Sequence, residues 1–241
     1  LIYIFFYIID LSLRKITKKS FLIYFKEFYE QDSYEEILIS NKKTKFFSPN
    51  SIIKWRLETF FTKETETLQW IDNFSGKKEI IFWDIGANIG IYSIYAAQKH
   101  DNIKIIAFEP STNNLRTLSR NIYLNDLTEK VIISQIALSD KKNKYLTMRE
   151  SNFIEGSAES AFGVDTDYEG NKFITKNKYK ILGNTINDLL GNEILEIPNY
   201  IKIDVDGVEH LVLRGANKFL KDKRIKSISV ELNEVLKEQY N

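Results

Sequence analysis

The chain has 241 residues, of which 43% are hydrophobic and 28% are charged, and 34 Lys and Arg against 33 Asp and Glu leave a formal net charge of +1. This balance is typical of a globular protein with a buried core, and it excludes wholesale disorder, a collagen-like fibre and a multi-span membrane protein. The near-zero charge provides no global attraction to nucleic acid, so we expect no such partner, and the absence of cysteine excludes disulfides and thiolate chemistry.

The chain opens with an apolar run over residues 1–9, which Asp10 interrupts before a basic segment. The run is shorter than the roughly 20 residues that cross a bilayer, and it lacks the features of a secretory signal. Three interpretations stay open: a helix packed on the domain, an interfacial anchor whose basic flank meets anionic lipid, or part of a longer segment, which the initial Leu1 favours. We expect a cytoplasmic protein and, on the second interpretation, peripheral membrane contact through residues 1–19.

Residues 1–75 are predicted to form a helical extension, and residues 76–241 a single α/β domain. In the extension, Thr62 is expected to cap a helix over residues 63–74. In the domain, strands alternate with helices and are rich in Ile, Val and Phe, which predicts a doubly wound, mostly parallel sheet. The predicted strands are 80–84, 104–109, 131–136, 200–205 and 227–231, and the predicted helices are 89–99, 110–125, a short helix capped by Thr185, and one from about Val208.

The polar segment 149–171 shows neither helical nor strand periodicity, so a long loop is the simplest interpretation. Such loops inside compact domains serve as lids or substrate loops, or are disordered.

Acidic side chains stand at the ends of several predicted strands. They are Asp84, Glu109, Asp204, Asp206 and Glu231. Because ligands of such sheets bind where the carboxyl ends of the strands meet the loops, we expect these acids to form one rim around a ligand crevice.

The first turn of the domain combines an acid with small residues. Gly86 and Gly90 permit a sharp turn from strand to helix and the close approach of a ligand, and Asp84 can accept hydrogen bonds from an amino group or a hydroxyl. Asn88 stands where a dinucleotide fingerprint requires its second glycine, so a ligand with a charged amino acid part and a ribose fits better than NAD. Glu109, on the next strand, is placed to accept the ribose hydroxyls.

A second cluster lies in segment 201–210. Period-two alternation directs Lys202, Asp204 and Asp206 to one face of an apolar strand, where burying three ionisable groups is costly without partners or a function. Three alternatives explain this cluster: a Lys–Asp pair that satisfies itself, a general base at the crevice, and a magnesium site. We predict no metal site. Glu209 and His210 are further candidates for the base.

Six motifs are similar to those of one known family. They are FWDIGANIGIYSIYAA (82–97), AFEPSTNNLRTLSRNIYLN (107–125), IALSD (136–140), TINDLL (185–190), IKIDVDGVEHLVLRGA (201–216) and VELNE (230–234). In this order, across about residues 55–234, the sequence resembles the FkbM-type family of S-adenosylmethionine-dependent methyltransferases. The resemblance implies a class I, Rossmann-like methyltransferase fold and O-methylation of a hydroxyl on a sugar, glycolipid or polyketide-like acceptor, as in polysaccharide biosynthesis.

The resemblance also implies which residues bind S-adenosylmethionine. The methionine part is expected at Asp84, Gly86 and Asn88, the ribose at Glu109, and the adenine near Ala137 and Leu138. Ala87, Gly90 and Pro110 complete the expected cofactor-binding set.

The catalytic candidates implied at the crevice are Asp204 first, then Asp206, Glu209 and His210. Asp206 departs from the family pattern, which often has Asp-x-Glu-Gly at this point, so the reach of its carboxylate differs. Only ten residues follow Glu231, which indicates a sheet truncated before its last two strands. The rival functions are an NAD-dependent sugar oxidoreductase, disfavoured by Asn88, and a cofactor-binding scaffold without catalysis.

Overall fold

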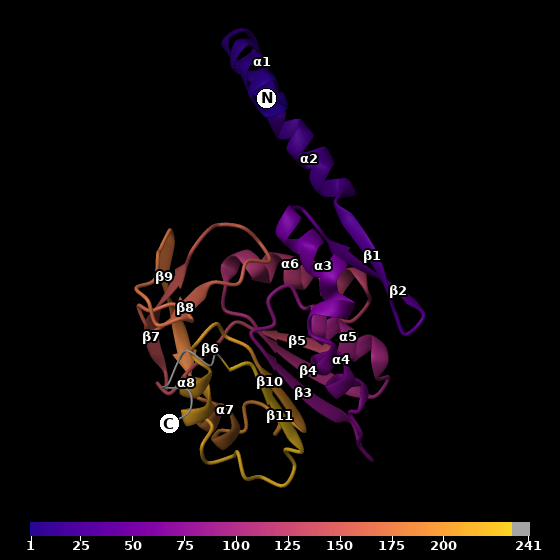
Figure 1. Ribbon diagram of the computed structural model, residues 1–241, viewed down its shortest axis with the longest axis vertical. Helices are drawn as coiled ribbons and strands as arrows, with labels where there is room; N and C mark the ends of the chain where they lie inside the picture. The colour runs from indigo at the N-terminus through magenta and orange to yellow at the C-terminus, as the bar shows by residue number, and fades with distance from the viewer. Residues whose placement is uncertain (233–241) are drawn as a thin grey trace.

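The computed structural model describes residues 1–232. Its central sheet has five parallel strands in the order β11-β10-β3-β4-β5 (Figure 1). The strands are β3 (Ile80–Ile85), β4 (Ile103–Phe108), β5 (Val131–Ser134), β10 (Tyr200–Ile203) and β11 (Ser227–Val230). The predicted doubly wound α/β fold is confirmed, and the prediction of a sheet truncated after Glu231 concerns residues 233–241, which lie outside the described residues.

Both faces of the central sheet are covered by helices. Successive residues of β3 point to opposite sides, so Phe82 packs in one apolar cluster and Trp83 in the other. Residues of four helices join the cluster around Phe82: α3 (Ser51–Lys63), α4 (Thr65–Asp72), α5 (Ile91–Lys99) and α6 (Thr112–Leu124). The cluster around Trp83 includes residues of α7 (Ile186–Gly191) and α8 (Glu209–Arg214). This three-layer arrangement leaves the strand ends and their loops as the place for a site.

A second sheet of four strands lies beside the first (Figure 1). In the order β6-β9-β7-β8, its strands are β6 (Ala137–Leu138), β9 (Asn177–Asn184), β7 (Lys144–Glu150) and β8 (Ser160–Phe162). Ala137, Met148 and Phe162 form its small core. The loop interpretation of residues 149–171 is therefore wrong in part, because this segment contains the end of β7 and all of β8.

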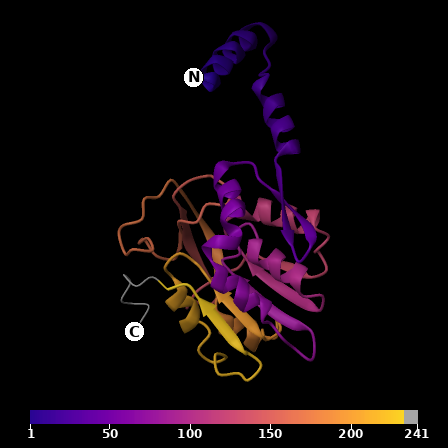
Figure 2. The same ribbon diagram turned by 45° about the vertical axis from the view of Figure 1, so that its right-hand side comes forward.

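The first residues form an arm that stands away from the body of the molecule (Figures 1 and 2). It consists of α1 (Ile2–Thr17) and α2 (Leu22–Asp32), and a hairpin of β1 (Tyr34–Ile39) and β2 (Lys42–Phe47) follows it. The hairpin is fixed to α6, where the backbone N–H of Phe47 donates to Asn121 Oδ1 at 2.8 Å. The interpretation of the first helix as packed on the domain is wrong, because its apolar side chains are exposed.

Helix capping agrees with the sequence at one predicted position and differs at another. Thr185 caps α7 as predicted, with its side chain accepting from the backbone N–H of Asp188. The cap predicted at Thr62 is wrong, since Asn50 caps α3 and the helix runs through Thr62. The backbone breaks at Glu64, which separates α3 from α4.

The turn after β3 touches the end of β10 through a glycine. Gly86 has a φ of +87°, and a Cβ built there would lie 1.8 Å from the carbonyl oxygen of Asp204. Only a glycine permits both the left-handed backbone and this approach of two chain segments. Gly86 therefore holds together the two strands that carry most of the predicted acids.

We expect Gly86→Ala to lower the free energy of unfolding by at least about 2 kcal/mol, because the left-handed backbone alone costs an alanine about 1–2 kcal/mol and the overlap with Asp204 adds to it. Thermal or urea unfolding measures the loss. Gly191→Ala is the matched control, since a Cβ there meets nothing within 4 Å. Equal stability of the two variants would contradict the assigned contact.

Candidate functional site

A cavity of about 220 Å³ opens where β3, β4 and β10 end. Ten residues singled out in the sequence line it: Gly86, Ala87, Asn88, Glu109, Pro110, Ala137, Leu138, Asp204, Asp206 and Glu231. Four predicted site residues lie outside its lining, namely Asp84, Gly90, Glu209 and His210. The expected acidic rim is thus largely assembled around one space.

The turn between β3 and α5 uses its N–H groups internally. The backbone N–H groups of Gly86 and Ala87 donate to the carbonyl of Phe108 at 3.0 and 2.9 Å. The backbone N–H of Asn88 donates to Glu109 Oε2 at 2.7 Å. A pyrophosphate needs such N–H groups as donors, so this turn is poorly suited to a dinucleotide.

Glu109 joins the turn to the neighbouring strand. Its second oxygen, Oε1, accepts from the backbone N–H of Ser111 at 2.8 Å, and the side chain is buried. Burial raises the pKa of Glu109 to about 8, although the two N–H groups act against this rise. Each oxygen keeps a lone pair for a ligand, so the side chain can accept hydrogen bonds from two neighbouring hydroxyls.

Lys202 lies among carboxylates on adjacent strands. Its Nζ is 2.6 Å from Asp204 Oδ2, and Asp84 is its register partner on β3. Burial lowers the pKa of Lys202, but the charges of Asp204 and Asp84 outweigh burial and hold it above its ordinary value. For Asp204, burial acts to raise the pKa, yet Lys202 lowers it to about 2. The sequence alternative of a Lys–Asp pair is therefore present, and it faces the cavity.

Asp84 lies behind this pair and is fully buried. Its Oδ2 accepts from Ser93 Oγ at 2.6 Å, while its Oδ1 has no hydrogen-bond partner among the described residues. The side-chain oxygen of Asn88 also lacks a partner within the same part of the chain. Buried polar atoms without partners are uncommon, and here they lie at or behind the cavity wall.

Asp206 and Glu231 hold their protons more strongly than ordinary carboxyls. Burial raises the pKa of Asp206 to about 7, and the nearby negative charge of Asp204 contributes. The hydrogen bond and charge of Asp204 raise the pKa of Glu231 to about 8. Asp206 Oδ2 also accepts weakly from the backbone N–H of Ser160 at 3.3 Å. The cavity thus combines Asp204, whose low pKa keeps it ionised at neutral pH, with Asp206 and Glu231, which titrate near neutral pH.

Glu209 and His210 do not reach the cavity. Glu209 Oε1 accepts from the backbone N–H groups of Val205 and Gly207 at 3.0 and 3.1 Å, which holds the turn that follows β10. His210 lies on the next position of α8 and is outside the cavity lining. Within residues 1–232, no group of three or more His, Asp or Glu side chains is arranged to hold a metal ion.

The sequence interpretation missed the contribution of α3 to the site. Arg56, Thr59 and Lys63 of α3 line the cavity. Arg56 Nε donates to the carbonyl of Gly156 at 2.6 Å, which ties α3 to the segment that precedes β8. That segment, flagged in the sequence as a lid or substrate loop, lines the cavity with Ser157 and other residues. No local pattern in α3 distinguishes a face that lines a cavity from one that packs in a core.

Comparisons with known proteins indicate a family. The sequence model of the family "Methyltransferase FkbM domain" matches residues 84–240. The chain is 31% identical over 156 residues to "Methyltransferase sdnD" of Sordaria araneosa, covering 56% of this chain and 60% of the relative. It is 28% identical over 145 residues to "Methyltransferase 1" of Beauveria bassiana, covering 55% of this chain and 56% of the relative. The chain thus spans less than two thirds of the length of these relatives.

Among solved structures, a precorrin-6Y C5,15-methyltransferase from Geobacter metallireducens is similar to this chain. The match has 16% sequence identity and a TM-score of 0.38, and it covers 69% of this chain and 59% of that one.

We expect stability to fall as the pH rises from about 5 to about 8. Carboxyls of an unfolded chain titrate near pH 4, whereas burial raises the pKa of Asp206 to about 7 and that of Glu109 to about 8. Between these values the folded chain binds more protons than the unfolded chain, so raising the pH favours unfolding. Thermal midpoints across this range measure the slope, and Asp206→Asn is expected to reduce it. A midpoint that rises with pH would contradict the assignment.

Proposed function

Because this chain belongs to the FkbM methyltransferase family, whose cofactor is S-adenosylmethionine, we propose that it transfers the methyl group of that cofactor to a hydroxyl oxygen. The observation that carries the proposal is the cavity at the strand ends, in which the turn 86–88, Glu109 and Asp206 face one space. Family membership and the internally bonded turn argue against the NAD-dependent oxidoreductase. The acceptor class that we propose is a sugar, glycolipid or polyketide-like hydroxyl.

The residues around the cavity suit the chemistry of the cofactor. Carboxylates favour a ligand that carries sulfonium and ammonium charges, and the partnerless oxygen of Asn88, which lines the cavity, is an acceptor for an amino group. Glu109 would hold the ribose hydroxyls, and the buried side chains of Ala137 and Leu138 offer an apolar surface to the adenine. When bound, the sulfonium cofactor supplies an already activated methyl group.

Asp206 is the best placed proton acceptor in this proposal. A general base works best with a pKa near the working pH, and Asp206 has a pKa of about 7. Asp204, the first choice from the sequence, has a pKa of about 2 and pairs with Lys202, which makes it a weak base. Its role in the proposal is to keep negative charge beside Asp206 and so to raise the basicity of that side chain.

The lining of the cavity includes groups for a polar acceptor. They are Arg56, Thr59 and Lys63 from α3, and Ser157 and Ser160 from the end of the segment that leads into β8 and from β8 itself. Hydroxyl and cationic donors of this kind form hydrogen bonds with a polyhydroxylated substrate. This lining supports a sugar-containing acceptor over an apolar one.

The direct test of the proposal is methyl transfer. The protein is incubated with labelled S-adenosylmethionine and cell-envelope glycans, and mass spectrometry locates the label. Label on a glycan hydroxyl is the expected result. Label only on protein or nucleic acid would overturn the acceptor class, and binding without turnover on any acceptor would favour the silent scaffold.

Glu109→Ala is expected to weaken the binding of S-adenosylmethionine by about 1.5–3 kcal/mol, because the positive charge of the cofactor favours the ionised form of Glu109, and the charge-assisted hydrogen bonds of that carboxylate to the ribose are lost. Isothermal titration calorimetry measures the change. Glu129→Ala, at an exposed position, is the matched control and should bind as the unmodified chain does. Tighter binding of NAD than of S-adenosylmethionine would disprove the cofactor assignment.

Asp206→Asn is expected to keep the fold and cofactor affinity while lowering kcat by about 10²–10⁴, the range for loss of a general base. Asp204→Asn is expected to lower stability by about 3–5 kcal/mol as well, because it removes the partner of the buried Lys202. Single-turnover kinetics and urea unfolding separate the two effects. Unchanged turnover in Asp206→Asn would return the proton-accepting role to Asp204.

A further inference from the structure

The N-terminal arm, residues 1–32, exposes apolar side chains in every direction. Positions 2–8 of α1 are all exposed, with Ile2 at 76% and Phe5 at 61%. Since successive residues of a helix point about 100° apart, seven consecutive positions cover its whole circumference. The second helix adds exposed apolar side chains at Ile23, Tyr24, Phe25, Phe28 and Tyr29. Contiguous apolar surface of this kind marks a site of protein or membrane contact.

The charge of the arm is positive and lies near its corner. Residues 1–26 contain a single acid, Asp10, and the basic residues Arg14, Lys15, Lys18, Lys19 and Lys26. Asp10 is buried, because its carboxylate binds Arg14 Nε at 2.6 Å and accepts from the backbone N–H of Phe21 at 2.7 Å. Asp10 is therefore satisfied within the arm, and the other acids of the arm, Glu27, Glu30 and Asp32, follow the corner towards its base. At the corner itself, Lys15, Lys18 and Lys19 present positive charge.

The same carboxylate fixes the corner between the two helices. It accepts hydrogen bonds from Ser20 Oγ and from the first backbone N–H groups of α2, so it acts as the cap that the start of α2 otherwise lacks. Phe6 of α1 packs on Phe25 of α2, with ring centroids 6.1 Å apart. The arm is thus an ordered bent element, and its base is attached to the body by an ion pair of 2.6 Å between Glu30 and Arg116.

We propose that this arm binds the surface of a bilayer that contains anionic lipids. A protein groove, or a second copy of this chain, covers one stripe of a helix, whereas lipid at the boundary between headgroups and acyl chains can cover a larger part of the apolar circumference of α1. The lysines at the corner complement anionic headgroups, and the tyrosines of the arm suit the boundary between headgroups and acyl chains. The proposal concerns attachment to a surface. In the described part of the chain no helix is both long and apolar enough to cross a membrane.

Flotation with vesicles tests the proposal on the chain as given. Vesicles of phosphatidylcholine with roughly a third phosphatidylglycerol should carry the protein, and high salt should weaken the partition because it screens the basic contacts. A variant with Lys15→Gln, Lys18→Gln and Lys19→Gln should partition about a hundredfold more weakly. A variant with Phe5→Glu and Ile8→Glu should lose at least about tenfold.

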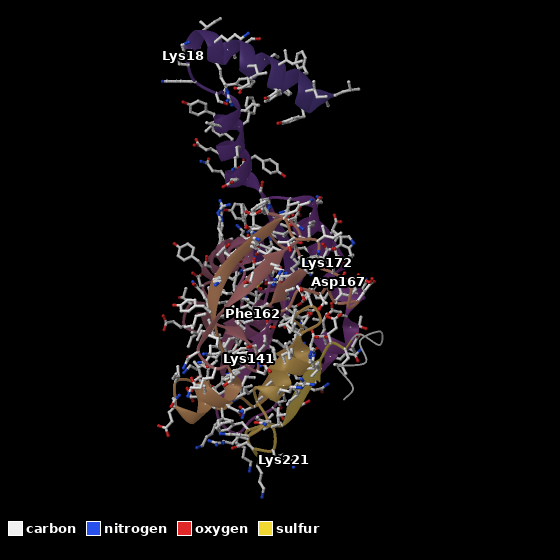
Figure 3. All side chains as sticks on the ribbon, turned by 90° about the vertical axis from the view of Figure 1, so that its left-hand side faces the viewer. Lys18, Lys141, Phe162, Asp167, Lys172 and Lys221 are labelled. Atoms are coloured by element: carbon white, nitrogen blue, oxygen red, sulfur yellow. The ribbon has the colours of Figure 1, made fainter. Side chains whose placement is uncertain are left out.

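A triple substitution on the body is the matched control. Lys141→Gln, Lys172→Gln and Lys221→Gln remove the same charge far from the corner that Lys18 marks (Figure 3), and they should leave partition unchanged. Thermal midpoints confirm that each variant is folded. Equal partition of the arm and control variants would overturn the proposal. A second result would also overturn the proposal: the protein does not bind vesicles, and it forms a dimer that Phe5→Glu and Ile8→Glu convert to a monomer. The arm would then bind a second copy of this chain.

Discussion

Lys202 carries its positive charge between two strands with only 4% of its surface exposed. A buried ammonium group is costly unless charged partners remain beside it, so the pairing with Asp204 constrains both β10 and β3. Glu64 and the ring of Tyr92 complete its surroundings, with Nζ 4.8 Å from the ring centroid. The orientation of Asp204 at the cavity therefore depends on this one charge.

The paired charge explains why neighbouring carboxyls differ in basicity. Asp204 keeps its negative charge at the expense of Asp206 and Glu231, because three carboxylates cannot all ionise in one poorly solvated space. Family membership indicates a cofactor with positive charge, and that charge would stabilise the ionised forms when bound. Binding of such a cofactor would therefore lower the pKa of Asp206 and of Glu231.

The sequence predicts the elements whose signals are local. Predominantly apolar strands, each with an acid at or just after its end, correctly identify β3, β4 and β10, and Thr185 marks the start of α7. The β1–β2 hairpin was missed because its Lys and Glu side chains conceal the alternation of a strand. The roles of Glu64 and Arg56 depend on where α3 docks, and that docking is decided by contacts between residues far apart in the chain.

The approach of Gly86 to the carbonyl of Asp204 has a consequence for protein engineering. The turn at Gly86 cannot move without displacing the backbone at Asp204. The effects of substitutions at these two strand ends on stability and activity would therefore be strongly non-additive. Other lining residues are held differently, because Thr59 and Lys63 belong to a helix and Ser157 to a connecting segment. Redesign of acceptor preference is therefore best directed to these side chains. Their volume and polarity can vary while the ion pair between Lys202 and Asp204 stays intact.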